Sequence, residues 1–177
     1  MSLRHAVLAA LSQGEASGYE LAKRFDVAVA DFWSATPQQL YRDLERLERD
    51  GLVEARVVEQ ERRPNKRVFT LTAAGRAALG EFVAAPARPA AIRDEFLIKL
   101  QAVDAGEPEA LIAAAEARLA RSREKLARYE QLRKRMGTEE SLGPSLTLEA
   151  GILYEEQNTR WTTLVLQRLR ERRAASG

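Results

Sequence analysis

The sequence predicts a mainly α-helical protein that contains one small β-hairpin. Its apolar residues are mostly Ala and Leu, its charged residues are mostly Arg and Glu, and aromatic residues make up only 6% of the chain, a composition that favours helices. Apolar residues recur at three- and four-residue spacings, as on one face of a helix, through much of the 177 residues. The pattern changes to alternation only over residues 52–72, where β-branched residues indicate strands.

The residue types that are missing argue against an enzyme. The chain has no cysteine and a single histidine, which excludes disulfides, thiol nucleophiles and cysteine metal sites. It has no glycine-rich phosphate loop and no pair of acids on a strand, so we expect a protein that is not an enzyme and has no cofactor and no metal. No run approaches the ~18 apolar residues of a membrane helix, and the N-terminus lacks a signal-peptide pattern. We therefore expect a cytoplasmic protein.

Two short helices are expected at the N-terminus. Apolar residues at helical spacing predict the first over residues 3–11, with His5 packed and hydrogen-bonded on its apolar face. After a turn, Ser17 caps a second helix over residues 19–25. Glu20 stands where the acidic partner of a capping box belongs.

A third helix is expected within residues 33–50. Thr36 and Pro37 are a capping hydroxyl and an N-terminal proline, and Gly51 supplies the left-handed residue that ends many helices. One face is apolar, through Leu40, Leu44 and Leu47. The opposite face carries two amides, a phenol and three arginines: Gln38, Gln39, Tyr41, Arg42, Arg46 and Arg49. Such a face suits a DNA recognition helix, although many surface helices share it.

A β-hairpin with a basic tip follows. Alternating apolar residues predict strands over residues 52–60 and 67–72, joined by a Pro-Asn turn over residues 61–66. Thr72 then caps a helix over residues 73–85. Four cations with no acid among them cluster at the turn: Arg62, Arg63, Lys66 and Arg67. The first 85 residues contain equal numbers of acidic and basic residues, so the positive charge is confined to this cluster. A local cluster of cations favours sequence-selective binding over general adhesion to nucleic acid.

Three short helices followed by a hairpin predict a winged helix-turn-helix domain, whose third helix enters the major groove of double-stranded DNA while the hairpin reaches the backbone or minor groove. We expect Gln38 and Gln39 to read base edges, since a glutamine amide pairs with adenine, and Arg42 to read guanine or hold phosphate. Contacts that fix the register on phosphates are expected from Ser17, Thr36, Tyr41 and Arg46. The wing contacts are expected from Arg62, Arg63, Asn65, Lys66 and Arg67.

The second half of the chain predicts a long antiparallel helix hairpin. Two prolines within residues 84–90 place a domain boundary between residues 1–85 and 86–177. A short helix is expected over residues 92–103, and long helices over residues 109–136 and 146–173, with a loop between them. Neither long helix can bury its wide apolar stripe alone, so we expect a dimerisation arm in preference to packing on the first domain. The expected homodimer interface is Leu119, Leu126, Tyr129, Leu153, Trp161 and Leu164.

Two further possibilities stay open. Large aromatic residues near the domain junction or dimer seam suit a small aromatic effector, although each also suits a core: Trp33, Tyr129, Tyr154 and Trp161. The alternative function is a helical adaptor whose winged-helix domain binds protein instead of DNA. The basic hairpin tip argues against that alternative, because a protein-binding domain has no evident need for it.

These segments together resemble the PadR family of bacterial transcriptional regulators, in the form that has a helical C-terminal domain of the virulence-activator-alpha type. The resemblance covers nearly the whole chain and rests on residues 2–25, 32–54, 62–79, 92–100 and 149–169. It implies a homodimeric winged-helix regulator, usually a repressor, that binds a palindromic operator and is often released by a small effector.

Individual residues match the family motifs. Gln39 and Tyr41 correspond to the family's Gln-x-Tyr in the recognition helix, Lys66-Arg67 to its wing, and Gly18-Tyr19 to the start of its second helix, which implies a DNA contact by Tyr19. Two positions depart from the pattern. Ser17 stands where many members have His, and Gln38 stands where many have Gly or Ser.

Overall fold

The computed structural model describes residues 3–24, 35–59, 65–87, 93–136 and 142–176. The chain divides into two compact units, residues 1–88 and residues 89–177, which are described separately. No described helix combines the length and the apolar character that a membrane span requires.

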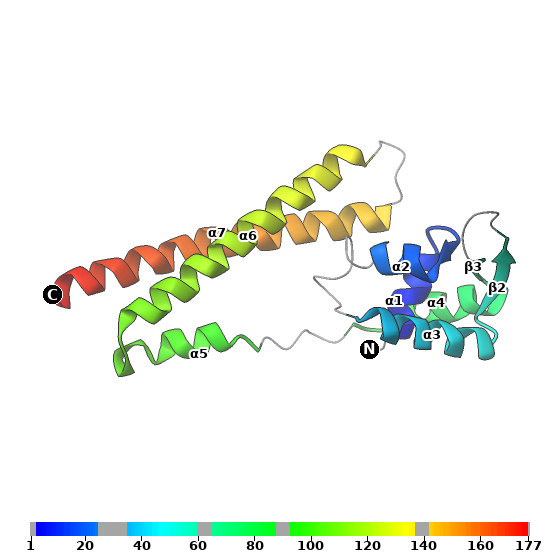
Figure 1. The fold of residues 1–177 in the computed structure, drawn as a ribbon, viewed down its shortest axis with the longest axis horizontal. Helices are drawn as coiled ribbons and strands as arrows, with labels where there is room; N and C mark the ends of the chain where they lie inside the picture. Colours follow the sequence, from blue (N-terminus) through cyan, green and yellow to red (C-terminus); the bar gives the residue numbers. More distant parts are fainter. Residues whose placement is uncertain (1–2, 25–34, 60–64, 88–92, 137–141, 177) are drawn as a thin grey trace. The chain divides into compact units, whose positions relative to one another are not determined.

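The described residues of the first unit form four helices and three strands, which Figure 1 labels. The helices are α1 (Leu3–Leu11), α2 (Gly18–Arg24), α3 (Pro37–Arg49) and α4 (Ala73–Ala84), and the strands are β1 (Ala16–Ser17), β2 (Val53–Val58) and β3 (Lys66–Leu71). The sheet is antiparallel with the order β1-β3-β2, and the pair nearest the hairpin tip is Val58 opposite Lys66. The sequence predicted the hairpin but not β1, whose two residues pair with Val68 and Phe69.

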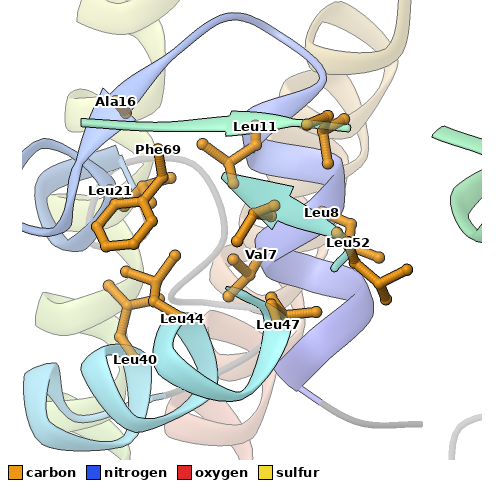
Figure 2. Close-up of a cluster of buried hydrophobic side chains, with 12 residues drawn as sticks. Val7, Leu8, Leu11, Ala16, Leu21, Leu40, Leu44, Leu47, Leu52 and Phe69 are labelled. Atoms are coloured by element: carbon orange, nitrogen blue, oxygen red, sulfur yellow. The ribbon is translucent and has the colours of Figure 1, made fainter. Parts of the chain in front are cut away.

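The core of the first unit lies between α1, α2, α3 and the sheet. Figure 2 shows the leucines of α3 beside Phe69 and opposite Val7 and Leu8 of α1. Leu40, Leu44 and Leu47 are each at most 1% exposed, which confirms the predicted apolar face of the third helix. Burial of each such side chain contributes roughly 1.5–3 kcal/mol. His5 is stacked on Phe82 at 4.1 Å between ring centroids, but its Nδ1 is buried without a partner among the described residues, so the expected hydrogen bond at that atom is absent.

Local signals in the sequence set the ends of these elements. Gly51 has φ of +71°, the left-handed conformation that lets the chain turn from α3 into β2. The Thr72 hydroxyl accepts a hydrogen bond from the Gly75 N–H and caps α4 as predicted. Gly75 also has a packing role, because a Cβ at that position would lie 2.0 Å from the Leu52 carbonyl oxygen.

Helices form all of the second unit that the structure describes: α5 (Glu95–Gln101), a short 3-10 turn (Val103–Ala105), α6 (Pro108–Arg135) and α7 (Leu142–Ser176). The two long helices lie side by side, as predicted for the helix hairpin (Figure 1). α7 begins four residues earlier than expected. Pro144 suggested a loop, but it falls in the first turn, where a helix needs no backbone N–H donor.

The face that α7 turns toward α6 differs from the expected seam. Its buried residues are Gly151, Ile152, Glu155, Thr162, Leu166 and Leu169, and they pack against Ile112, Ala115, Leu119, Ser122 and Tyr129 of α6. The 3-4 spacing in the sequence favours a seam through Ala150, Leu153, Gln157, Trp161 and Leu164. Trp161 is half-buried, but the other four residues of this seam are exposed. α7 therefore has two apolar stripes, of which α6 covers one.

Candidate nucleic-acid interface

The polar face of α3 is exposed and offers unpaired donors. Gln38, Tyr41, Arg42 and Arg46 are all exposed on the side of the helix away from the core. Arg46 forms an ion pair with Asp43 at 3.5 Å within the same helix. Arg42 forms none with any residue that the structure describes. The Gln38 amide and the Arg42 guanidinium are therefore both available to an outside partner.

A reciprocal capping box at the start of α3 engages two residues that were predicted to contact DNA. The Gln39 N–H donates to the Thr36 hydroxyl at 3.2 Å, and the Thr36 N–H donates to Gln39 Oε1 at 2.9 Å. A bidentate pair with adenine needs that same amide oxygen, so Gln39 cannot read a base in this way while it caps the helix. Thr36 is likewise committed to its cap. The Thr-x-x-Gln spacing is a capping signal that was present in the sequence.

A second capping box, at the start of α2, corrects the expected role of Ser17. The Ser17 hydroxyl donates to Glu20 Oε2 at 2.8 Å, and the Ser17 N–H donates to the same oxygen at 2.7 Å. Ser17 is only 7% exposed, so its hydroxyl is occupied and cannot reach a phosphate in this arrangement. Tyr19, which follows the buried Gly18 in the first turn of α2, is 73% exposed and remains accessible.

Gly18 fixes the position of Tyr41. A Cβ at Gly18 would lie 2.2 Å from the Tyr41 ring, so the bare backbone of α2 is what lets the ring pack there. This contact joins the first turn of α2 to the exposed face of α3. Tyr41 is still 46% exposed, which leaves part of its ring open to a ligand.

The cations at the base of the wing are paired with acids, which the sequence did not predict. Lys66 Nζ lies 3.3 Å from Glu20 Oε1 of α2. Arg67 Nη2 lies 2.7 and 2.5 Å from the two carboxylate oxygens of Glu48, in the last turn of α3. Asn65 is exposed and immediately precedes β3. Arg62 and Arg63 lie outside the described residues. The acids are 19 and 46 residues from their partners, so no local pattern reveals these pairs.

Glu20 collects several donors and is held strongly in its charged form. The hydrogen bonds from the Ser17 backbone and side chain, followed by the Lys66 ammonium, lower the pKa of Glu20 from 4.5 to about 2. Arg56 and Glu15 form a neighbouring ion pair at 2.5 Å across a shallow hollow on this side of the sheet. The charges on this surface therefore largely neutralise one another.

The aromatic residues expected at an effector site lie in unlike environments. Trp33 lies outside the described residues. Tyr129 is 4% exposed and packs on Gly151 between α6 and α7, whereas Tyr154 is 62% exposed on α7. Trp161 meets Phe96 edge-to-face at 5.9 Å. Tyr129 is therefore a core residue, and the aromatic residues that the structure describes do not gather into one pocket.

Trp161 belongs to a packed polar cluster in the second unit. The Arg118 guanidinium lies 5.3 Å from the Trp161 ring centroid and 5.5 Å from that of Phe96. The same group donates to Asp94 at 2.7 Å and to Asn158 at 3.4 Å. This network ties the start of α5 to α6 and α7.

The expected dimer residues fall into two groups. Leu119 and Tyr129 are 8% and 4% exposed within the pair of long helices, so they offer little surface to a second chain. Leu126 and Trp161 are half-buried. Leu153 and Leu164 are 58% and 51% exposed and remain available.

Two family models match this chain and together cover both units. Residues 7–81 match the transcriptional regulator PadR-like family, and residues 92–170 match the virulence activator alpha C-terminal domain. The probable transcriptional regulator Rv1176c of Mycobacterium tuberculosis is 35% identical over 189 residues, which cover 98% of this chain and all of that protein. The chain belongs to the PadR-like family of transcriptional regulators.

Solved structures of family members share the fold of this PadR-like protein. Bacillus subtilis PadR in complex with operator DNA matches with a TM-score of 0.80 at 25% identity, over 94% of this chain and 98% of that one. In sequence, the negative transcriptional regulator PadR of that organism is 33% identical over 98 residues, which are 55% of this chain and 54% of that protein. The Vibrio cholerae virulence activator AphA matches with a TM-score of 0.75 at 30% identity, over 96% and 99% of the two chains. B. subtilis PadR with p-coumaric acid matches with a TM-score of 0.73 at 24% identity, over 94% of this chain and 98% of that one. At this identity the match establishes a shared fold only.

Proposed function

We propose that this chain is a sequence-specific DNA-binding repressor that acts as a homodimer on a palindromic operator. The observation that carries the proposal is the exposed face of α3, where the Gln38 amide and the Arg42 guanidinium have no partner among the residues that the structure describes. The operator complex of B. subtilis PadR and the name of that organism's negative regulator support the proposal by similarity.

Gln38 and Arg42 are the proposed base readers. In the major groove a glutamine amide donates to adenine N7 and accepts from its N6 amino group, and an arginine donates to guanine O6 and N7. Both residues lie in the first two turns of α3, the part of a recognition helix that usually meets base edges. Gln39 next to them holds the helix start in place through its capping bond.

Polar groups that are exposed or partly exposed around this face are the proposed phosphate contacts. They are Tyr19 at the start of α2, Tyr41 and Arg46 on α3, and Asn65 and Lys66 on the wing. Arg62 and Arg63, which lie outside the described residues, are proposed as further wing contacts from the sequence. Lys66 forms one contact of 3.3 Å with Glu20, and both side chains are partly exposed, so its exchange from carboxylate to phosphate costs little. Such contacts fix the register on the duplex, while the bases supply the sequence preference.

Gel-shift titration with the DNA upstream of the coding region tests base reading. Gln38→Ala and Arg42→Ala should each weaken binding to the operator by about 1–3 kcal/mol and relax its sequence preference. Gln131→Ala and Arg133→Ala are matched controls, because they remove the same groups from exposed positions on α6. If all four variants bind like the unmodified protein, α3 is not the reading element.

A homodimer would present two copies of α3 to the two halves of the operator. The exposed stripe on α7 supports this assembly. Leu142, Leu146, Leu153 and Leu164 are spaced by four, seven and eleven residues, which places them on one side of the helix. All four are at least 51% exposed in the single chain, and large apolar side chains gathered on one exposed side of a helix favour an interaction site there.

Release by a small aromatic effector is a further part of the proposal, supported by the p-coumaric acid complex of B. subtilis PadR. The half-buried Trp161, between Phe96 and Arg118, is the reporter in the described residues best placed to sense a ligand in the second unit. Titration with p-coumaric acid should quench tryptophan fluorescence and weaken operator binding. A panel of phenolic acids that changes neither signal would remove the effector from the proposal.

A further inference from the structure

Arg67 differs from Lys66, the other wing cation that the structure describes, in the direction of its side chain. It lies on β3 two residues before Phe69, so the two side chains stand on the same face of the strand. Phe69 is 3% exposed and packs against the leucines of α3 (Figure 2). The Arg67 guanidinium lies 5.2 Å from the Phe69 ring centroid and reaches the Glu48 carboxylate beyond it. Arg67 is therefore directed at the recognition helix.

The Glu48 carboxylate on α3 holds the Arg67 guanidinium in this position. It follows the buried Leu47 in the last turn of the helix, and its side chain is 34% exposed against 47% for that of Arg67. One guanidinium nitrogen contacts both carboxylate oxygens, at 2.7 and 2.5 Å, whereas Lys66 makes a single longer contact with Glu20. The Arg67 pair is the tighter of the two.

Transfer of Arg67 to a DNA phosphate would have an electrostatic penalty. It would leave the Glu48 carboxylate without its cation on the helix that approaches the duplex, where a negative charge repels the phosphate backbone. It would also remove the guanidinium from the Phe69 ring. Both effects favour an Arg67 that stays on Glu48 when DNA is bound.

We propose that Arg67 and Glu48 are positioning residues, which hold the base of the wing against the recognition helix, and that Arg67 does not neutralise a phosphate. The inference rests on the proposed DNA-binding function and reassigns one residue that the sequence placed among the wing contacts. When the Arg67–Glu48 ion pair is formed, the wing and α3 meet the duplex at a fixed spacing. The phosphate contacts of the wing then come from its other polar residues.

An exchange of charges separates the two roles. Arg67→Glu alone should weaken operator binding by ~10–100-fold, because two carboxylates then repel each other at the wing base. The double variant Arg67→Glu with Glu48→Arg restores the pair in reverse and should return to within about fivefold of the unmodified affinity. If Arg67 held a phosphate, a glutamate at position 67 would still repel DNA and the double variant would stay weak, which would overturn the proposal.

A neutral pair and the salt dependence give a second, independent readout. The double variant Arg67→Gln with Glu48→Gln removes the ion pair without a change in net charge, and it should weaken operator binding by about fivefold or more. The same neutral pair should leave the slope of log affinity against log salt unchanged, because it leaves no unpaired charge, whereas loss of a phosphate contact lowers the slope by about one unit per protomer. Full affinity in the neutral pair, or a flatter slope, would contradict the positioning role.

The control is the Arg170–Glu116 pair, which has the same chemistry at 2.7 Å between α7 and α6 and is similarly exposed. Its reversal should leave operator binding unchanged. Thermal melts of every variant identify those that fail to fold. If the unmodified protein binds no upstream DNA, the proposed function itself is wrong. If the unmodified protein binds but the double variant Arg67→Glu with Glu48→Arg stays weak, only the positioning role of the pair is wrong.

Discussion

The two units differ in how completely a single chain buries their apolar residues. In the first unit Val7, Leu8, Leu21 and Leu44 are all 0% exposed, and α1, α2, α3 and the sheet close around them. In the second unit α6 covers one stripe of α7, while Leu142 and other leucines of the second stripe stay in solvent. The first unit is thus complete within one chain, and the second has a surface that a further copy can cover. The unit that contains α3 thus closes its own core, and the other unit has the exposed stripe that we propose for assembly.

Leu44→Ala should have the largest effect, because it opens a cavity in the closed core of the first unit. Loss of a fully buried leucine lowers the free energy of unfolding by about 2–5 kcal/mol. Chemical denaturation should show this loss to the same extent at low and high protein concentration. A loss that disappears at high concentration would mean that the first unit, too, depends on a partner chain.

Leu153→Ala should act on association instead of on folding of the chain. Leu153 is 58% exposed, so its removal leaves no cavity in a single chain. A symmetric dimer loses the contact twice, which should raise the dimer dissociation constant by about 10–100-fold. Sedimentation across a concentration series measures this change. Thr147→Ala is the control, because Thr147 is exposed on the same helix about a third of a turn away. Equal dissociation constants for the two variants would exclude this stripe as the dimer interface.

Much of the first unit was predictable because its signals are local. The α3 stripe through Leu44, the Gly51 turn and the Thr72 cap each depend on residues within one or two turns, and all three are confirmed. The role of Gln39 was also readable from its spacing to Thr36. It was missed because a glutamine on a polar face also suits base reading, and the sequence alone does not rank the two uses.

The errors concern partners that are distant in sequence. No pattern links Lys66 to Glu20 or Arg67 to Glu48, because the pairs form only after the hairpin folds onto α2 and α3. The same limit applies to α7. Two apolar stripes satisfy the helical period equally well, and only the packing of α6 determines that Ile152 is inside and Leu153 is outside.

The smallest expected effect is on the pH dependence of stability. It concerns two glutamates near helix starts, Glu20 in the first unit and Glu95 in the second. Glu20 of the first unit accepts two hydrogen bonds from Ser17 of its own cap and contacts Lys66 of the wing, whereas Glu95 of the second unit pairs only with Lys99 one turn along its own helix. Both contacts lower the pKa of the carboxyl group: that of Glu20 to about 2, by its hydrogen bonds with Ser17 first, and that of Glu95 through the Lys99 ammonium. Only the Glu20 contacts join separate elements.

A lowered pKa in the folded state means that the ionised carboxylate stabilises the fold above pH 4.5, and that this contribution is lost as the pH falls from 4.5 toward 2. The Glu20 side chain is 46% exposed, so solvent screening reduces the contribution to roughly 1 kcal/mol. Urea unfolding of the unmodified protein and of Glu20→Gln should therefore differ at pH 7 and converge near pH 2. Glu95→Gln is the comparison variant and should show a smaller difference at pH 7, which also closes at low pH, because the Lys99–Glu95 pair is more exposed and more strongly screened by solvent. A gap between the Glu20→Gln protein and the unmodified one that stays constant with pH would mean that the cap acts through hydrogen-bond geometry, without a contribution from charge.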